Sequence, residues 1–202
     1  MHYCPIVCLK PSDESIKSEK KTVFKPSMTL GRRTELGFRL GLLEVRKRAH
    51  GHAECSRLWH EYTVLSQLKG LAVPEVLHYE SEGDTASLYM QYCQGKNLKD
   101  AQLTTGLHHR IRTALNPIHN LNFVHGDLAE EHIIIGKKII FVDWEHAMKR
   151  GDQINRCSFR PVRLGYSHPN LIWGKGIVEV YLDHWSLASI FRITLQPPIG
   201  SL

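Results

Sequence analysis

The sequence predicts an α+β fold, with a β-rich first half that contains a single helix and a mainly helical second half. In the first half, short apolar runs alternate with turn residues, which is the pattern of successive strands. In the second half, apolar residues recur mostly at the spacing of helices. A chain of 202 residues is long enough for one domain, or for two small lobes that share a cleft.

Short strands begin the first half, and the last of them is predicted over 40–47. Its alternation places Val45 and Lys47 on one face and Arg46 on the other. A helix follows over 53–69, because apolar residues recur there at helical spacing until a glycine ends the run.

A strand hairpin is predicted next, over 73–80 and 86–93, because the residues SEGDT supply a turn between two apolar runs. The second half begins after Gly95. Its first helices are predicted over 97–102 and 107–121.

Two further apolar runs, at 132–135 and 139–144, surround the turn sequence GKK and predict a pair of buried strands. An irregular segment over 150–180 then leads to an apolar helix over 181–195, which Pro197 and Pro198 end.

The composition is that of an ordinary globular protein, with 42% hydrophobic and 23% charged residues and a mean hydropathy of -0.27. No apolar run approaches the roughly 18 residues that a membrane-spanning helix needs. The five cysteines are odd in number and mostly isolated, which suits a reducing compartment better than a disulfide framework. Without the pattern of a signal peptide, we expect a cytoplasmic protein with no membrane span and an irregular leader over 1–22.

The net charge is +6, and the basic residues fall partly in short clusters. This balance favours acidic partners such as nucleotides, phospholipid or nucleic acid. A short basic run is more often a solvated face, so direct nucleic-acid binding is the lesser alternative. The scattered histidines and the pair Cys4 and Cys8 are interpreted as surface or terminal residues rather than metal ligands.

Two aspartates, at positions 127 and 143, follow apolar runs in the stretch FVHGDLAEEHIIIGKKIIFVDWEHA. Each by itself is typical of a turn or a strand end. Phosphoryl transfer, however, needs a carboxylate near the incoming hydroxyl, another on magnesium and a cation on the nucleotide phosphates. The two aspartates, separated by a short hairpin, are candidates for these two carboxylates.

With the β-rich first half and its lone helix, these motifs resemble the protein-kinase-like superfamily over roughly residues 23–196. Within it, the HGD sequence that ends at Asp127 is similar to that of small atypical serine/threonine kinases, RIO-like and lipopolysaccharide-kinase-like. The resemblance implies a bilobal kinase-like domain, with an N-lobe over 23–93 and a minimal, truncated C-lobe over 94–202. It also implies ATP and Mg²⁺, or Mn²⁺, as cofactors.

The resemblance implies roles for four charged residues. Asp127 would orient the acceptor hydroxyl and accept its proton, and Asp143 would bind the metal. Lys47 would hold the nucleotide phosphates, with Glu61 in the helix as the carboxylate that fixes it. Glu54 is the rival partner for Lys47.

The segment between the two halves resembles a hinge whose backbone receives adenine. Its four residues are Met90, Gln91, Tyr92 and Cys93. Packing in the core is the equal alternative for these side chains. Further along, residues 165–170 are similar to the end of an activation segment, and Asp183 to an aspartate that supports the catalytic loop from below.

Several departures from the family's pattern bear on activity. His132 stands as a candidate metal residue where the family has an asparagine for a second magnesium, and imidazole is a poor ligand for such a hard cation. Either one metal suffices, Glu130 or Glu131 substitutes, or turnover is lost. The family's Gly-rich loop is not recognisable, and Glu145 replaces the glycine of its D-F-G motif.

The sequence therefore predicts an atypical kinase that transfers the γ-phosphoryl group of ATP to a hydroxyl, on a protein serine or threonine. The principal alternative is a pseudokinase that binds nucleotide or a protein partner as a regulatory module, which His132 and the missing Gly-rich loop favour. A second alternative is a small-molecule or lipid-sugar kinase, which the HGD and DWE sequences favour and the helix containing Asp183 opposes.

Overall fold

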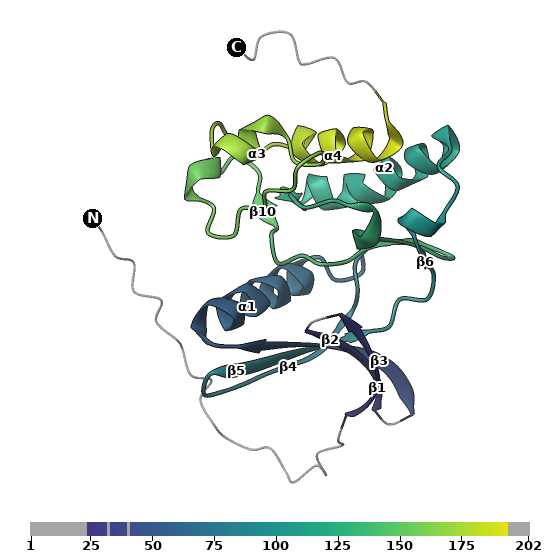
Figure 1. Ribbon diagram of the computed structural model, residues 1–202, viewed down its shortest axis with the longest axis vertical. Coiled ribbons are helices and arrows are strands. Elements are labelled where there is room, and N and C mark those ends of the chain that lie inside the picture. The colour runs from purple at the N-terminus through teal and green to yellow at the C-terminus, as the bar shows by residue number, and fades with distance from the viewer. Residues whose placement is uncertain (1–23, 32, 40, 194–202) are drawn as a thin grey trace, which may run out of the picture.

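The computed structural model describes residues 24–31, 33–39 and 41–193, which form a sheet with one helix followed by a mainly helical part (Figure 1). The leader predicted over 1–22 and the prolines predicted to end the last helix lie outside the described residues. Within this described part of the chain, no helix combines the length and the apolar character needed to cross a membrane.

Five antiparallel strands form the sheet, in the order β1-β2-β3-β5-β4. Their bounds are Lys25–Gly31 for β1, Thr34–Arg39 for β2, Leu42–His50 for β3, Val76–Glu82 for β4 and Thr85–Gln91 for β5. The strand predicted over 40–47 is β3, and the predicted hairpin is β4 with β5. Gly83 adopts a positive φ of 55° in the hairpin turn, a conformation that glycine accepts readily.

The helix α1 (His52–Gln67) lies between this sheet and the rest of the protein (Figure 1). It corresponds to the helix predicted over 53–69, and it buries Leu58, Val64 and Leu65. In the register of β3 with β5, Val45 pairs with Met90 and Lys47 with Leu88. Because strand side chains alternate, the face of β3 that carries Lys47 is the face that α1 covers.

The second part begins with a short strand rather than with the helix predicted over 97–102. Lys96 and Asn97 pair with Ile135 and Ile134, so the chain starts this segment extended. Ala101 is extended again, which leaves only a single turn of 3-10 helix, η1 (Leu98–Asp100), between them. Tertiary pairing with another strand therefore overrode the local helical preference.

The remaining elements comprise the predicted helices and buried strands together with short elements that the sequence did not predict, and two of these short elements are helical turns within 150–180, the segment predicted to be irregular. They are β6 (Lys96–Asn97), α2 (Thr105–Asn120), β7 (Phe123–Val124), η2 (Glu130–His132), β8 (Ile133–Ile135), β9 (Ile139–Phe141), β10 (Met148–Lys149), η3 (Ile154–Arg156), α3 (Pro169–Trp173) and α4 (Tyr181–Phe191). The helix α2 starts earlier than predicted, because the Thr104 hydroxyl accepts a hydrogen bond of 3.1 Å from the Leu107 N–H and caps it. The predicted buried strands are β8 and β9, which pair antiparallel.

One hydrophobic core joins the sheet to the helical part. Leu65 of α1 and Leu88 of β5 belong to the same buried cluster as Leu115 of α2 and Trp144, which follows β9. The Phe141 N–H also donates to the Ala72 carbonyl at 2.8 Å. The β8–β9 hairpin is thereby fixed against the segment that follows α1.

We expect Leu65→Ala to destabilise the protein by about 2 to 5 kcal/mol, because the side chain is 1% exposed and its loss leaves a cavity. Urea unfolding followed by circular dichroism measures this difference. Leu164→Ala is the matched control, since Leu164 is 81% exposed, and its effect should stay within about 0.5 kcal/mol. Equal losses in the two variants would contradict the assignment of Leu65 to the core.

Candidate active site

The short hairpin β8–β9 brings the two aspartates of the sequence motif close to one histidine. Asp143 lies two residues after β9, and Asp127 lies in the loop between β7 and η2. His132 Nδ1 is 2.6 Å from the main-chain oxygen of Asp127, and its Nε2 is 3.3 Å from Oδ2 of Asp143. The aspartates thus approach opposite sides of one imidazole ring.

The ammonium of Lys47 joins three separate segments. It donates to Oε1 and Oε2 of Glu61 at 2.8 and 2.9 Å, and to Oδ1 of Asp143 at 2.6 Å. The Trp144 N–H donates to the same Glu61 carboxylate at 3.2 Å. One cation therefore ties β3 and α1 to the loop after β9. The rival Glu54 is instead half exposed and lies 3.8 Å from Arg33.

These contacts fix the charges of the site. Burial by itself would lower the pKa of Lys47, but Glu61 and Asp143 outweigh it and raise that pKa above its usual range. Burial would likewise raise the pKa of Asp143, but the attraction of Lys47 outweighs it and lowers that pKa well below its usual range. At neutral pH, the carboxylate of Asp143 is therefore ionised, and it lies beside the charged ammonium of Lys47.

Asp183 of α4 fixes the loop that carries Asp127 through hydrogen bonds to its main chain. Its Oδ2 accepts from the His125 N–H and from His119 Nε2, both at 2.9 Å, and its Oδ1 accepts from the Gly126 N–H at 2.9 Å. Burial alone would raise the pKa of Asp183, but the hydrogen bonds from His119 and Gly126 help to lower it. A fully buried carboxylate with these donors keeps the loop in one conformation.

Two residues of the site have left-handed backbone conformations. Gly126 has a φ of +78°, and a Cβ there would lie 2.5 Å from Met148 Cε, so the middle position of HGD accommodates only glycine without rearrangement. Asp143 has a φ of +69°, which costs a non-glycine residue about 1 to 2 kcal/mol. The hydrogen bond from Lys47 offsets this cost and fixes where the Asp143 carboxylate points.

The two histidines of the site face different partners, and these partners indicate where ring protons lie. The Asp127 N–H donates to His125 Nδ1 at 3.3 Å, and His125 Nε2 faces the Val142 carbonyl at 3.0 Å. Burial lowers the pKa of His125, so this ring is neutral with its proton on Nε2. His132 faces a carbonyl with Nδ1, which places a proton on that atom and directs Nε2 toward Asp143.

The site offers magnesium one ionised carboxylate, that of Asp143. Magnesium in proteins is commonly held by one or two carboxylates, with phosphate oxygens and water completing its octahedron. Asp143 supplies such a carboxylate. His132 supplies only a nitrogen, which is a poor ligand for this ion. Among residues 24–31, 33–39 and 41–193, no group of three or more His, Cys, Asp and Glu side chains is arranged to hold a metal by itself.

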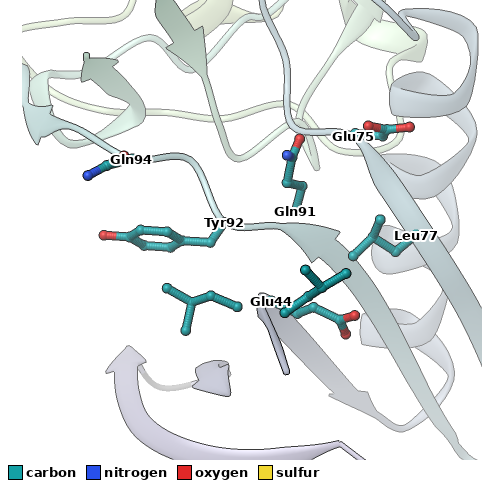
Figure 2. A pocket seen from close by; sticks show the side chains of 8 residues that line it. Glu44, Glu75, Leu77, Gln91, Tyr92 and Gln94 are labelled. Atoms are coloured by element: carbon teal, nitrogen blue, oxygen red, sulfur yellow. The ribbon is translucent and has the colours of Figure 1, made fainter. Parts of the chain in front are cut away.

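The predicted hinge residues separate into two environments. Met90 pairs with Val45 and is buried at 4% exposure in the core, on the face of β5 that Lys47 shares. Gln91 pairs with Glu44 and is exposed on the opposite face. Gln91 and Tyr92 line an outer pocket of about 450 Å³ with Leu42, Leu43, Glu44, Glu75, Leu77 and Gln94 (Figure 2). Cys93 is half-buried, and burial raises the pKa of its thiol.

Two arginines at the site were not found from the sequence. Arg33, in the turn between β1 and β2, donates from Nη2 to the Glu145 carboxylate at 2.9 Å. Arg163, from the segment before α3, donates to Asp127 and to Glu131. Both pairings join residues far apart in the chain, so no local motif signals them.

The chain was compared with known proteins, and no family model matches it. A probable cell division protein kinase of Encephalitozoon cuniculi (strain GB-M1) is 30% identical over 115 residues, which make up 54% of this chain and 40% of that protein. The serine/threonine-protein kinase pkn2 of Myxococcus xanthus is 27% identical over 145 residues, 67% of this chain and 16% of that protein. The chain is distantly similar to protein kinases.

A third relative is a probable bifunctional tRNA threonylcarbamoyladenosine biosynthesis protein of Methanobrevibacter smithii, 29% identical over 90 residues, 44% of this chain and 16% of that protein. The matched stretches span less than half the length of each of these relatives. The similarity to protein kinases agrees with the α+β fold and with the order of the HGD and DWE sequences along the chain.

We expect Asp183→Asn to lower the free energy of unfolding at neutral pH by about 2 to 3 kcal/mol, because an amide replaces an ionised acceptor of three hydrogen bonds. The pKa of Asp183 is lower in the folded protein than in the unfolded chain. Its contribution is therefore present above about pH 4 and decreases as the pH falls further. Urea unfolding at a series of pH values measures this, with the exposed Asp100→Asn as control. A difference that grows toward acid pH would contradict it.

Proposed function

We propose that this chain is an atypical ATP- and magnesium-dependent kinase that transfers the γ-phosphoryl group to a hydroxyl, with a protein serine or threonine as acceptor. The observation that carries the proposal is the shared ammonium of Lys47, which contacts Glu61 and Asp143 at once. A cation held at a fixed point beside an ionised carboxylate is what a triphosphate with its metal requires.

In this proposal each side chain has one task. Lys47 binds nucleotide phosphate oxygens, and Glu61 keeps its ammonium in place. Asp143 holds magnesium, which neutralises charge on the phosphates when it is bound. Asp127 orients the acceptor hydroxyl and takes its proton as the new bond forms. His125 is neutral and buried, and it positions Asp127 through the main chain.

We further propose that the chain forms two lobes with the site between them. We assign 23–93 and 94–202 to two lobes of one kinase-like domain, with adenine received by the backbone of the segment from Met90 to Cys93. The HGD sequence supports a place among the small atypical kinases, RIO-like or lipopolysaccharide-kinase-like. We also propose a cytoplasmic location; among the residues that the structure describes, Cys55, Cys93 and Cys157 are free thiols.

A pseudokinase is the second candidate, and His132 is the observation that favours it. Its imidazole occupies the space between the two aspartates and offers magnesium a nitrogen rather than an oxygen. In that case the chain would bind nucleotide or a regulatory protein partner and turn over slowly. Kinases that use a small molecule or lipid sugar as acceptor share the same phosphate machinery, and acceptor screening separates them.

We expect Asp127→Asn to reduce phosphoryl transfer by about 10² to 10⁴-fold, because the amide cannot accept the proton of the acceptor. Asp143→Asn should weaken magnesium-dependent nucleotide binding as well as transfer. Labelled ATP with magnesium or manganese and a generic protein acceptor such as dephosphorylated casein gives the measurement. Asp100→Asn is the exposed control and should match the wild type. A wild type with no more transfer than both site variants would eliminate the enzyme and leave the pseudokinase.

We expect His132→Asn to lower the magnesium concentration needed for half-maximal ATP binding roughly tenfold, which corresponds to about 1.4 kcal/mol from one added oxygen ligand. Fluorescent nucleotide titrated with magnesium measures the effect. His132→Ala is the control, because it removes the imidazole without adding an oxygen and should show no gain. If the two variants behave alike, His132 does not limit metal binding.

A further inference from the structure

Arg163 contacts both acids on the acceptor side of the proposed site. Its Nε donates to Asp127 Oδ1 at 3.2 Å, and its Nη2 approaches Asp127 Oδ2 at 3.4 Å. Its Nη1 donates to Glu131 Oε1. Both oxygens of the proposed base are therefore covered by one guanidinium. This is a fork-to-fork arrangement, in which a planar cation matches a planar anion.

The main chain that carries Arg163 is fixed. The Arg163 N–H donates to the Ser167 hydroxyl at 2.9 Å, and the Ser167 N–H donates back to the Arg163 carbonyl at 2.9 Å. The hydroxyl of Ser186, in α4, donates to the Tyr166 carbonyl at 3.0 Å. The root of the side chain is thus anchored to α4, while 34% of the side chain is exposed. The contacts that anchor this segment do not involve the guanidinium, so Arg163 can change partners without breaking them.

The other cations described at this site are paired with carboxylates other than Asp127. Lys47 is bound to Glu61 and Asp143, and Arg33 is bound to Glu145. Of the arginines and lysines that the structure describes, the one that forms an ion pair with Asp127 is Arg163. Burial alone would lower the pKa of Arg163, but Asp127 and Glu131 outweigh it and raise that pKa, so the group keeps its charge.

While the fork remains in place, each oxygen of Asp127 gives one of its lone pairs to the guanidinium. An acceptor hydroxyl must then compete with Arg163 for this carboxylate. A phosphoryl group carries more negative charge than a carboxylate, and a guanidinium binds it with the same two-point geometry. A phosphoryl group bound beside Asp127 would therefore be a stronger partner for the guanidinium than Asp127 itself.

We propose that Arg163 moves from Asp127 and Glu131 onto the oxygens of the transferring phosphoryl group and stabilises its charge in the transition state. This inference rests on the kinase function proposed above. As the acceptor oxygen bonds to phosphorus, the bond from phosphorus to the bridging oxygen of ADP breaks, and ADP leaves with that electron pair. The hydroxyl proton passes to the Asp127 oxygen that Arg163 has vacated. The chain thereby supplies its own arginine to the reaction.

The opposing explanation is that the contact of Arg163 with Asp127 is inhibitory. It predicts the opposite change in turnover when Arg163 is removed. If Arg163 only blocks Asp127, its removal exposes the base and turnover rises. If Arg163 stabilises the transition state, its removal exposes the base and turnover still falls, because the charge on the phosphoryl oxygens is no longer neutralised.

The test compares Arg163→Ala and Arg163→Lys in the full chain with Arg156→Ala, an exposed arginine of η3 that serves as the matched control. Arg163→Ala should lower kcat by about 10³-fold or more, within the range seen for an arginine supplied in the same chain, with KM for ATP changed less than about threefold. Arg163→Lys should retain part of the rate, and added guanidine should restore part of the rate of Arg163→Ala. Arg156→Ala should match the wild type.

A second measurement does not depend on turnover. Calorimetry compares binding of ADP with magnesium to binding of ADP with magnesium and aluminium fluoride, which mimics the phosphoryl group in transit. Arg163→Ala should weaken the aluminium fluoride complex at least tenfold and leave ADP binding unchanged. Equal affinity of wild type and Arg163→Ala for that complex overturns the inference, as does a rise in kcat or an equal loss of both complexes. A wild type that tightens on aluminium fluoride but transfers nothing supports Arg163 and overturns the proposed function alone.

Discussion

The structure of the site depends on one partly buried ammonium, that of Lys47, shared by two carboxylates. Neither Glu61, which is almost fully buried, nor Lys47 could stay charged in that environment without a partner, because removing a lone charge from water costs several kcal/mol. Since their third partner, Asp143, comes from the loop after β9, the ammonium joins the sheet, α1 and the helical part at one point. The Trp144 N–H adds a hydrogen bond to the same cluster, and Trp144 itself belongs to the core.

A second buried anion organises the other side of the site. Asp183 directs two main-chain N–H groups and one imidazole onto a single carboxylate, and this determines the path of the chain into Asp127. The two anchors explain why glycine stands at 126 and why Asp143 tolerates a left-handed backbone. Acidic groups on both sides of the site must be compensated, and the arginines from two distant loops, Arg33 and Arg163, do so.

The local sequence pattern was sufficient to predict most helices and strands. It was insufficient where pairing with a distant strand determined the structure. The helix over 53–69 and the hairpins are recognisable because apolar spacing reports which face is buried. The helix expected over 97–102 is instead a strand and one helical turn, because Asn97 pairs with Ile134. For the hinge, alternation could have separated Met90 from Gln91, since neighbouring strand residues face opposite sides.

The sequence by itself determined the fold class, the order of elements, and the acidic and basic residues around which a phosphoryl-transfer site could form. It did so because hydrophobic period and short motifs are local properties of the chain. Only the tertiary structure decided that Lys47 selects Glu61 over Glu54, that His132 stands between two aspartates, and that Arg163 covers Asp127. Those choices depend on distances between segments that are remote in sequence, and charge pairing acts through space over a few ångströms.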